Sequence, residues 1–212
     1  VWWAEQTGER GSGDPLITLF TEDNVAGAPP SDLPSAAVFR GIGWAALHSA
    51  LDRPDEDTFF LFKSSPFGSV SHSHADQNSF AILKGGRALA IPSGYYGPSY
   101  GMPHHAEWTR QTKANNCILT NGQGQTVRDL EAAGRIADFR HQKAITYVCG
   151  DAAAAYKGKL QRFLRHVLFL RPGVFMVLDE LAAPEPAQFS WLLHAFDRMD
   201  VDRVGSTVVA TR

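Results

Sequence analysis

Apolar residues fall into short stretches along the chain, where they either alternate with polar residues or run together for about five positions. Both patterns are typical of β-strands, and Gly, Pro and Asn-Gly turn signals separate them. No helix longer than two turns is predicted, and residues 152–156 are ambiguous between a helical turn and a strand. We predict about ten strands, hence an all-β fold built as an antiparallel β-sandwich of two stacked sheets. These strands lie within residues 38–47, 58–62, 79–83, 88–91, 117–120, 134–141, 144–149, 160–170, 174–178, 189–195 and 204–210.

The beginning of the chain differs from the rest. Clusters of Gly, Pro and Ser at Gly11–Pro15 and Ala28–Asp32 are typical of turns or linkers. We expect residues 1–35 to be a linker or edge segment from an upstream domain, and residues 36–212 to form the β-sandwich domain. Because the last predicted strand runs almost to Arg212, we expect this domain to be truncated at its C-terminus, within a longer protein.

The composition of the chain excludes some classes of protein and some partners. The chain has 212 residues, of which 44% are hydrophobic and 20% charged, and this composition excludes a disordered protein. A formal net charge of −2 gives no reason to expect a nucleic-acid partner. No apolar run approaches the 18 or so residues of a membrane span, so no membrane partner is expected. Cys117 and Cys149 lie among apolar neighbours and are expected to be buried free thiols.

Several conspicuous side chains receive structural interpretations. Trp44 and Trp191 lie within predicted strands and are expected in the core. The basic run at residues 157–165 is expected on the solvent-facing side of a strand; it consists of Lys157, Lys159, Arg162 and Arg165. Four histidines on predicted strands are expected to be structural, with satisfied hydrogen bonds: His48, His141, His166 and His194. No phosphate-binding glycine loop, Gly-x-Ser-x-Gly elbow or Cys-x-x-Cys pair is present.

The densest polar stretch is Ser69–Asn78, directly before a predicted strand. His72, His74 and Asp76 are spaced two apart, so on an extended chain they point the same way. Such a set suits a metal ion or a hydrogen-bonded site with polarised imidazoles. A polar loop whose side chains cap the backbone is the alternative.

Two further stretches carry candidate chemistry. Residues 92–105 form a Gly- and Pro-rich loop with three tyrosines and two histidines, which suit sugar contacts or proton transfer. Residues 107–116 contain a stacking candidate, Trp108, and two cations, Arg110 and Lys113, that could hold an anionic group. A solvated basic turn is the alternative for this last stretch.

Taken together and in this order, the three stretches resemble the heparinase II/III-like polysaccharide lyases, most closely the exo-acting oligoalginate lyases. The likeness covers roughly residues 38–195 and rests on Ser71–Phe80, Ala90–Tyr96 and Trp108–Asn116. It implies an N-terminal α/α toroid followed by a β-sandwich, with the active site between them. This chain would then be the sheet part, and the toroid its missing partner. The resemblance points to the bacterial periplasm or cytoplasm without choosing between them.

The resemblance also implies cleavage of a uronic-acid polymer by β-elimination, with the acid and base largely supplied by the toroid. His72 is the candidate catalytic histidine of the sheet domain, and Tyr96 and Tyr100 are candidates for the same cleft. The expected substrate-binding residues are His74, Gln77, Asn78, Tyr95, His104, His105, Trp108, Arg110 and Asn115. The expected partner is a uronate-containing oligosaccharide or polysaccharide, with alginate favoured.

A departure from the family concerns its structural metal. Where several relatives carry a second histidine, an aspartate and a further histidine as ligands, this chain has His74, Pro92 and Asn115. Proline has no side-chain ligand and asparagine is a poor zinc ligand. We therefore expect no structural zinc and no cofactor, while a weakly held ion at His74 and Asp76 remains open.

Three alternatives stay open at this point. The chain could be a heparin- or heparan-type lyase of the same family, because the sequence does not identify the uronic acid. It could instead be a carbohydrate-binding β-sandwich without catalysis, in which the tyrosines and Trp108 form a stacking platform. It could also be a purely structural module whose histidines make internal hydrogen bonds.

Overall fold

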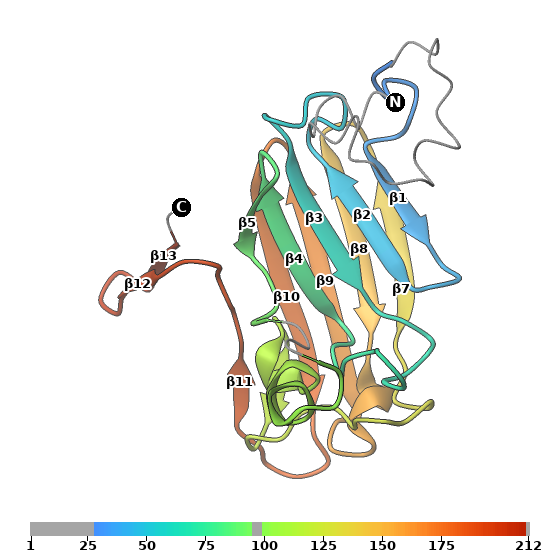
Figure 1. Cartoon of the computed structure of the whole chain (residues 1–212), viewed down its shortest axis with the longest axis vertical. Helices are drawn as coiled ribbons and strands as arrows, with labels where there is room; N and C mark the ends of the chain where they lie inside the picture. The colour runs from blue at the N-terminus through green and yellow to red at the C-terminus, as the bar shows by residue number, and fades with distance from the viewer. Residues whose placement is uncertain (1–27, 95–98, 211–212) are drawn as a thin grey trace.

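The computed structural model, which describes residues 28–94 and 99–210, contains two antiparallel sheets stacked face to face (Figure 1). The first sheet follows chain order and consists of β1 (Ala36–Phe39), β2 (Trp44–His48), β3 (Thr58–Lys63), β4 (Ser79–Lys84) and β5 (Arg87–Ala90). The second has the order β10-β9-β8-β7 and consists of β7 (Arg135–His141), β8 (Ile145–Asp151), β9 (Arg162–Leu170) and β10 (Val174–Ala182). The predicted all-β antiparallel sandwich is confirmed.

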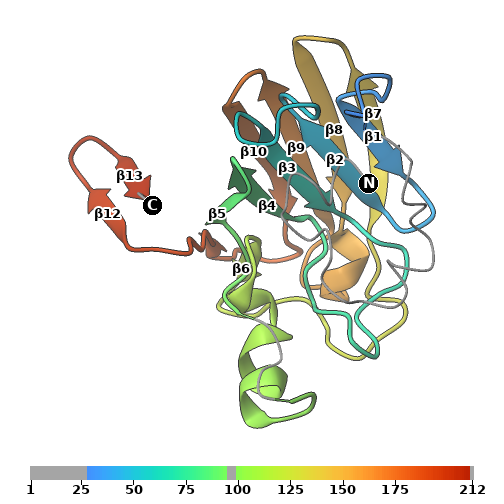
Figure 2. The same cartoon turned by 45° about the horizontal axis from the view of Figure 1, so that its top comes forward.

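Smaller elements extend the sandwich at one end. β6 (Ile118–Thr120) pairs with β11 (Phe189–Trp191), and β12 (Met199–Asp202) forms a separate hairpin with β13 (Thr207–Ala210) (Figure 2). Three short helical turns complete the described chain: η1 (His105–Thr109), η2 (Thr112–Ala114) and η3 (Ala153–Tyr156). None of the described helices has the length and apolar character needed to cross a lipid bilayer.

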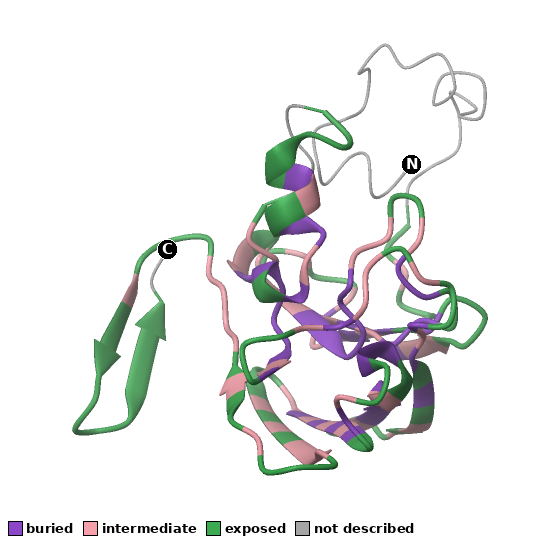
Figure 3. Cartoon of the chain, turned by 90° about the horizontal axis from the view of Figure 1, so that it is seen from below, coloured by how far each residue is buried: buried purple, intermediate pink, exposed green. Residues whose placement is uncertain are grey.

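The core lies between the two sheets. Buried residues alternate with more exposed ones along strands such as β3 and β9, and Figure 3 shows this alternation in colour. On β3, Phe60 and Phe62 are fully buried, and β9 faces them with Val167 and Phe169. The rings of Phe169 and Phe175 stack with centroids 4.4 Å apart. Each buried phenyl ring contributes roughly 1.5–3 kcal/mol through the hydrophobic effect, so the period-two pattern of the sequence stabilises the sandwich directly.

Turn residues account for one clear difference in strand boundaries. Residues 38–47, predicted as one β segment, form the β1–β2 hairpin, because the chain reverses at residues 40–43. Gly43 has a φ of +69°, a conformation that favours glycine. The predicted turns at Gly85-Gly86 and Asn121-Gly122 also have positive φ. The predicted linker largely falls at residues 1–27, outside the described residues, and the boundary at residue 36 stays a prediction.

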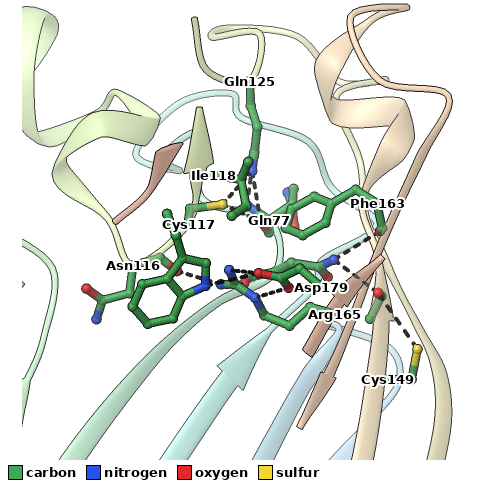
Figure 4. A network of polar contacts seen from close by, with 12 residues as sticks. Gln77, Asn116, Cys117, Ile118, Gln125, Cys149, Phe163, Arg165 and Asp179 are labelled. Carbon is green, nitrogen blue, oxygen red and sulfur yellow. Dashed lines mark hydrogen bonds and ion pairs between the residues drawn. The ribbon is translucent and has the colours of Figure 1, made fainter. Parts of the chain in front are cut away.

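The expectation that Arg165 faces solvent is wrong. On β9, Arg165 shares the inward face with Phe163 and Val167, and its side chain is 0% exposed. Its Nε and Nη2 donate to the two carboxylate oxygens of Asp179 at 2.7 and 2.8 Å (Figure 4). Its Nη1 donates to the carbonyl oxygens of Asn78 and Asn116 at 2.7 and 2.8 Å. Because the buried guanidinium has this many partners, the ion pair of Arg165 and Asp179 has a structural role.

The tryptophan predictions are also wrong, whereas the four histidines assigned to structure have the hydrogen-bond partners expected of them, although His194 follows β11 instead of lying on a strand. Trp44 is 39% exposed and Trp191 is 47% exposed, so neither belongs to the core. Trp191 donates its indole N–H to Asp179 at 3.0 Å. Each of the four histidines assigned to structure has a polar partner: His48 with Asp57, His141 with Thr146, His166 with Tyr147 and Glu180, and His194 with Asn116.

Candidate functional site

The loop between β3 and β4, which carries the His-x-His-x-Asp motif, is tied to the segment around η1 and η2. The amide of Ala75 donates to the carbonyl of Arg110 at 2.9 Å. The hydroxyl of Thr112 donates to the carbonyl of Ala75 at 2.8 Å. Two of the three polar stretches, more than thirty positions apart, therefore meet through their backbones.

Four rings gather where these segments meet, and we call them the His–Tyr cluster: His72, His74, Tyr100 and His105. The ring of Tyr100 lies 4.5 Å from that of His72 and 4.7 Å from that of His105, measured between centroids. His74 and His105 are 6.1 Å apart. His72 and Tyr100 are exposed, whereas His105 is fully buried. The cluster thus has an accessible side and a protected side.

Arg110 lies against the protected side of the cluster and is only 2% exposed. Its Cζ is 5.3 Å from the centre of the Tyr100 ring, and its Nη2 donates to the Tyr100 hydroxyl at 3.0 Å. The carbonyl oxygen of Ser71, the residue before His72, accepts two hydrogen bonds. One comes from the Tyr100 hydroxyl at 2.8 Å and the other from Nη2 of Arg110. Its Nε and Nη1 have no hydrogen-bond partner, and it forms no ion pair, within residues 28–94 and 99–210. Arg110 therefore places beneath the cluster a positive charge that no carboxylate of the described residues pairs with.

The electrostatics of the cluster keep two of its imidazoles neutral. Burial, followed by the charge of Arg110, lowers the pKa of His105. Burial also lowers the pKa of His74; the carboxylate of Asp76 opposes this, and the positive charges of Lys63 and Arg110 add to it. The amide of Gly101 donates to Nδ1 of His105 at 2.9 Å, so this nitrogen is an acceptor. Neutral imidazoles accept protons and hydrogen bonds, as a site for proton transfer requires.

The accessible side of the cluster borders an open hollow of about 550 Å³. The Lys63 ammonium and the Asp76 carboxylate form an ion pair on its wall. The side chains that matter for its chemistry are Trp44, Lys63, Phe67, His72, His74 and Asp76. The arrangement combines hydrogen-bonding rings, apolar surface and a nearby buried cation, which suits an anionic ligand with apolar faces.

Comparison with known proteins identifies the family of this chain. Residues 31–212 match the family model described as heparinase II/III-like, C-terminal. The chain belongs to the heparinase II/III-like family. The family resemblance of the sequence is therefore confirmed, but nothing in the comparisons supports its oligoalginate branch specifically.

Solved structures show the same fold at low sequence identity. The heparan sulfate lyase HepC of Pedobacter heparinus matches with a TM-score of 0.71 at 20% identity, over 97% of this chain and 30% of that chain. A heparinase III structure matches with a TM-score of 0.68 at 19% identity, over 95% of this chain and 30% of that chain. This chain therefore spans about 30% of the length of these relatives. No curated protein sequence matches.

Within this heparinase II/III-like domain, three predicted substrate-binding residues lie inside the protein. Gln77, Asn78 and Asn115 are 0% exposed. Gln77 accepts the amide of Ser65 at 2.6 Å, and Asn78 donates to the carbonyl of Gly150 on β8 at 3.0 Å. Asn115 donates to the carbonyl of Gln111 at 2.8 Å. These bonds argue against direct substrate contact and give the three amides a role in holding the loops.

The remaining predicted site residues are divided between surface and interior. His104 and Trp108 are exposed, and the Trp108 indole donates to the carbonyl of Ser93 at 3.0 Å, with Lys113 5.4 Å from its ring centre. Arg110 and His105 are buried, so their effect on a ligand is electrostatic or acts through Tyr100. Tyr95 and Tyr96 lie outside the described residues, and their roles stay predictions.

Three residues of the hollow were missed by sequence reasoning: Trp44, Lys63 and Phe67. Trp44 was placed in the core because it lies in a strand, although its neighbours Ala45 and Leu47 take the inward positions expected of alternate residues. Phe67 carries a weak signal, since a large apolar residue in a polar loop of Ser, Pro and Gly is unusual. Lys63, at the end of β3, carries no sequence signal of a place in the hollow.

The three positions that the resemblance equates with the metal ligands of several relatives do not fit a zinc ion in this chain. Pro92 offers no side-chain ligand, and Asn115 offers only a neutral amide oxygen, which is a poor zinc ligand. Asp76 is held by the Lys63 ammonium rather than left available to His74. Among the residues described, no group of three His, Cys, Asp or Glu side chains is arranged to hold a metal ion. The expectation of no structural zinc stays a prediction, supported by the chemistry of these side chains.

Proposed function

We propose that the full protein cleaves a uronate-containing polysaccharide by β-elimination, and that this domain forms one wall of its active site. The observation that carries the proposal is the His–Tyr cluster, which opens onto the hollow on one side and on the other contacts Arg110, a cation with no carboxylate partner among the described residues. We propose further that an N-terminal α/α toroid supplies the opposite wall together with most of the acid–base machinery.

The chemistry explains why such a wall is needed. In β-elimination a base removes the proton on C5, a C4–C5 double bond forms, and the C4–O bond breaks as an acid protonates the leaving oxygen. The C5 proton is weakly acidic because the adjacent carboxylate is negatively charged. Groups that stabilise negative charge on this carboxylate lower the barrier. His72 reaches the hollow and would contact the carboxylate, while Arg110 adds a positive potential from beneath.

Tyr100 has a separate part in this proposal. Its hydroxyl accepts from Arg110 and donates to the Ser71 carbonyl, so it links the buried cation to the backbone before His72. This linkage holds His72 in place and leaves 44% of the Tyr100 residue exposed to a ligand. Tyr100 therefore both orients the catalytic histidine and lines the cleft.

For the substrate, the comparisons favour heparan-type polymers over alginate. Both solved structures cited above are named as heparan sulfate lyase or heparinase, whereas the alginate assignment rests on short motifs alone. Both polymers are chains of pyranose rings bearing carboxylates, and the proposed chemistry is the same for both.

The test is the ultraviolet absorbance of the unsaturated product, followed with the full-length protein on heparan sulfate, heparin and alginate. We expect product on heparan sulfate, and we expect His72→Ala to lower kcat/KM by about a hundredfold or more without changing the melting temperature. His141→Ala, which removes a structural histidine of β7, is the control and should leave kcat/KM unchanged. Absence of product on all three polymers would exclude the lyase proposal.

A further inference from the structure

Two aromatic side chains face the hollow beside the His–Tyr cluster, and the elimination chemistry does not use them. Trp44, at the start of β2, is 39% exposed, and Phe67, in the loop after β3, is 56% exposed. Both line the same hollow as His72 and His74. Large apolar rings exposed in a concave site lose contact with water when a ligand covers them, and this loss favours binding.

The backbone holds these two rings in a fixed relation. Trp44 pairs directly with Lys63 in the β2–β3 register, and the amide of Ser64 donates to the carbonyl of Gly43 at 2.7 Å. The turn before Trp44 is pressed so closely against the chain after β3 that a Cβ on Gly43 would lie 2.1 Å from the carbonyl oxygen of Ser64. Only glycine fits this contact, so the position of Trp44 relative to the segment leading to Phe67 is set before any ligand arrives.

The charges around the hollow leave apolar contact as the main attraction at this position. The Lys63 ammonium is paired with the Asp76 carboxylate, so these two charges largely cancel for a ligand. His74 has a lowered pKa and carries little charge at neutral pH. A ligand that docks beside them finds two aromatic faces rather than a second cationic clamp.

We propose that Trp44 and Phe67 form a sugar-ring subsite, which holds a pyranose of the uronate chain by stacking next to the unit that reacts at His72. This inference rests on the proposed function for its ligand class. The axial C–H groups of a pyranose present an apolar face that matches an aromatic ring, and the hydroxyl groups at its edge stay hydrated. The subsite contributes binding energy equally before and during the reaction, because it contacts a ring that does not change bonds.

The experiment measures KM and kcat of the full-length protein on whichever of heparan sulfate and alginate it cleaves. Trp44→Ala and Phe67→Ala should each raise KM about five- to tenfold while kcat stays within about twofold. Trp44→Phe keeps an aromatic face and should restore most of the loss. Phe189→Ala is the matched control, because Phe189 on β11 is also 39% exposed but does not line the hollow.

Each outcome decides the inference. Unchanged KM in both Trp44→Ala and Phe67→Ala, with an active parent protein, overturns the subsite and leaves the lyase proposal intact. In a second outcome, both variants have a lowered melting temperature, kcat and KM fall together, and Trp44→Phe gives no rescue. This result shows that the rings pack against another part of the protein instead. If Trp44→Ala does not fold, Phe67→Ala and Trp44→Phe decide in the same way. An inactive parent protein that also fails to bind either polymer in a calorimetric titration overturns both proposals.

Discussion

Two buried arginines occupy opposite electrostatic situations in this domain. Arg165, between the sheets, has a bidentate carboxylate partner and two backbone carbonyls, so its charge is compensated on every side (Figure 4). Arg110, beneath the His–Tyr cluster, bonds only through Nη2 and has no carboxylate partner among the described residues. Burial of a charge without compensation costs free energy, and proteins keep such groups where function requires them. From this difference we infer a structural role for Arg165, and we propose a role in the chemistry for Arg110.

The largest expected effect comes from removing the partner of Arg165. Asp179→Asn should lower the free energy of unfolding by about 3–5 kcal/mol, because it leaves the guanidinium buried without a counter-charge. Urea denaturation followed by circular dichroism measures it. Asp138→Asn, which breaks an exposed pair with Arg140, is the control and should cost about 1 kcal/mol or less. Equal losses in the two variants would contradict a structural role for the Arg165 pair.

A smaller effect on stability and a larger one on activity are expected at Arg110. Arg110→Met should change the free energy of unfolding by about 1 kcal/mol or less, because losing two hydrogen bonds is offset by removing an unpaired buried charge. The same variant should lower kcat/KM at least tenfold if the cation stabilises charge on the substrate. A loss of stability as large as that of Asp179→Asn, with normal kinetics, would make Arg110 a second structural arginine.

The smallest expected effect is the pH dependence of stability that Arg110 helps to create. Burial and this cation lower the pKa of His105 in the folded state, so the unfolded chain takes up a proton more readily, at a pKa near 6.5. The free energy of unfolding should therefore decrease as pH falls through about 6.5, and the contribution should be complete above it.

His105→Gln keeps an acceptor for the Gly101 amide but does not titrate, so its stability should fall less steeply between pH 7 and pH 5. In Arg110→Met too, the free energy of unfolding should fall less steeply between pH 7 and pH 5. Denaturation series at several pH values measure these slopes. A slope identical to that of the parent in His105→Gln would show that other groups cause the pH dependence.

The sequence contained enough to place Arg165, and its interpretation as a solvent-facing residue ignored that information. Counting by twos from Phe163 and Phe169 puts Arg165 on the inward face. The chain turns at residues 171–173 between β9 and β10, and the register of this hairpin pairs Arg165 with Asp179. The same count would have moved Trp44 out of the core, since Ala45 and Leu47 take the inward positions.

The candidate site was less accessible to such reasoning. Side chains of the three polar stretches lie close together in the structure. No periodicity relates loop residues, so spacing does not reveal which of these side chains are buried and which reach the hollow. Arg110 reaches the carbonyl of Ser71, 39 positions away, and Asn78 reaches β8, 72 positions away. Such contacts depend on how the two sheets stack, which is a property of the whole domain.

The contact of Asn78 with Gly150 has a practical consequence for protein engineering. Asn78 ends the loop that carries His72, has a φ of +60°, and bonds across the interior to the opposite sheet. A Cβ on Gly150 would lie 2.2 Å from the Asn78 side-chain oxygen and 2.6 Å from the Phe62 ring. The loop is therefore fastened to the framework at its C-terminal end. Attempts to redirect specificity by grafting loops should exchange residues 66–75 and retain Gln77, Asn78 and Gly150 as a fixed boundary.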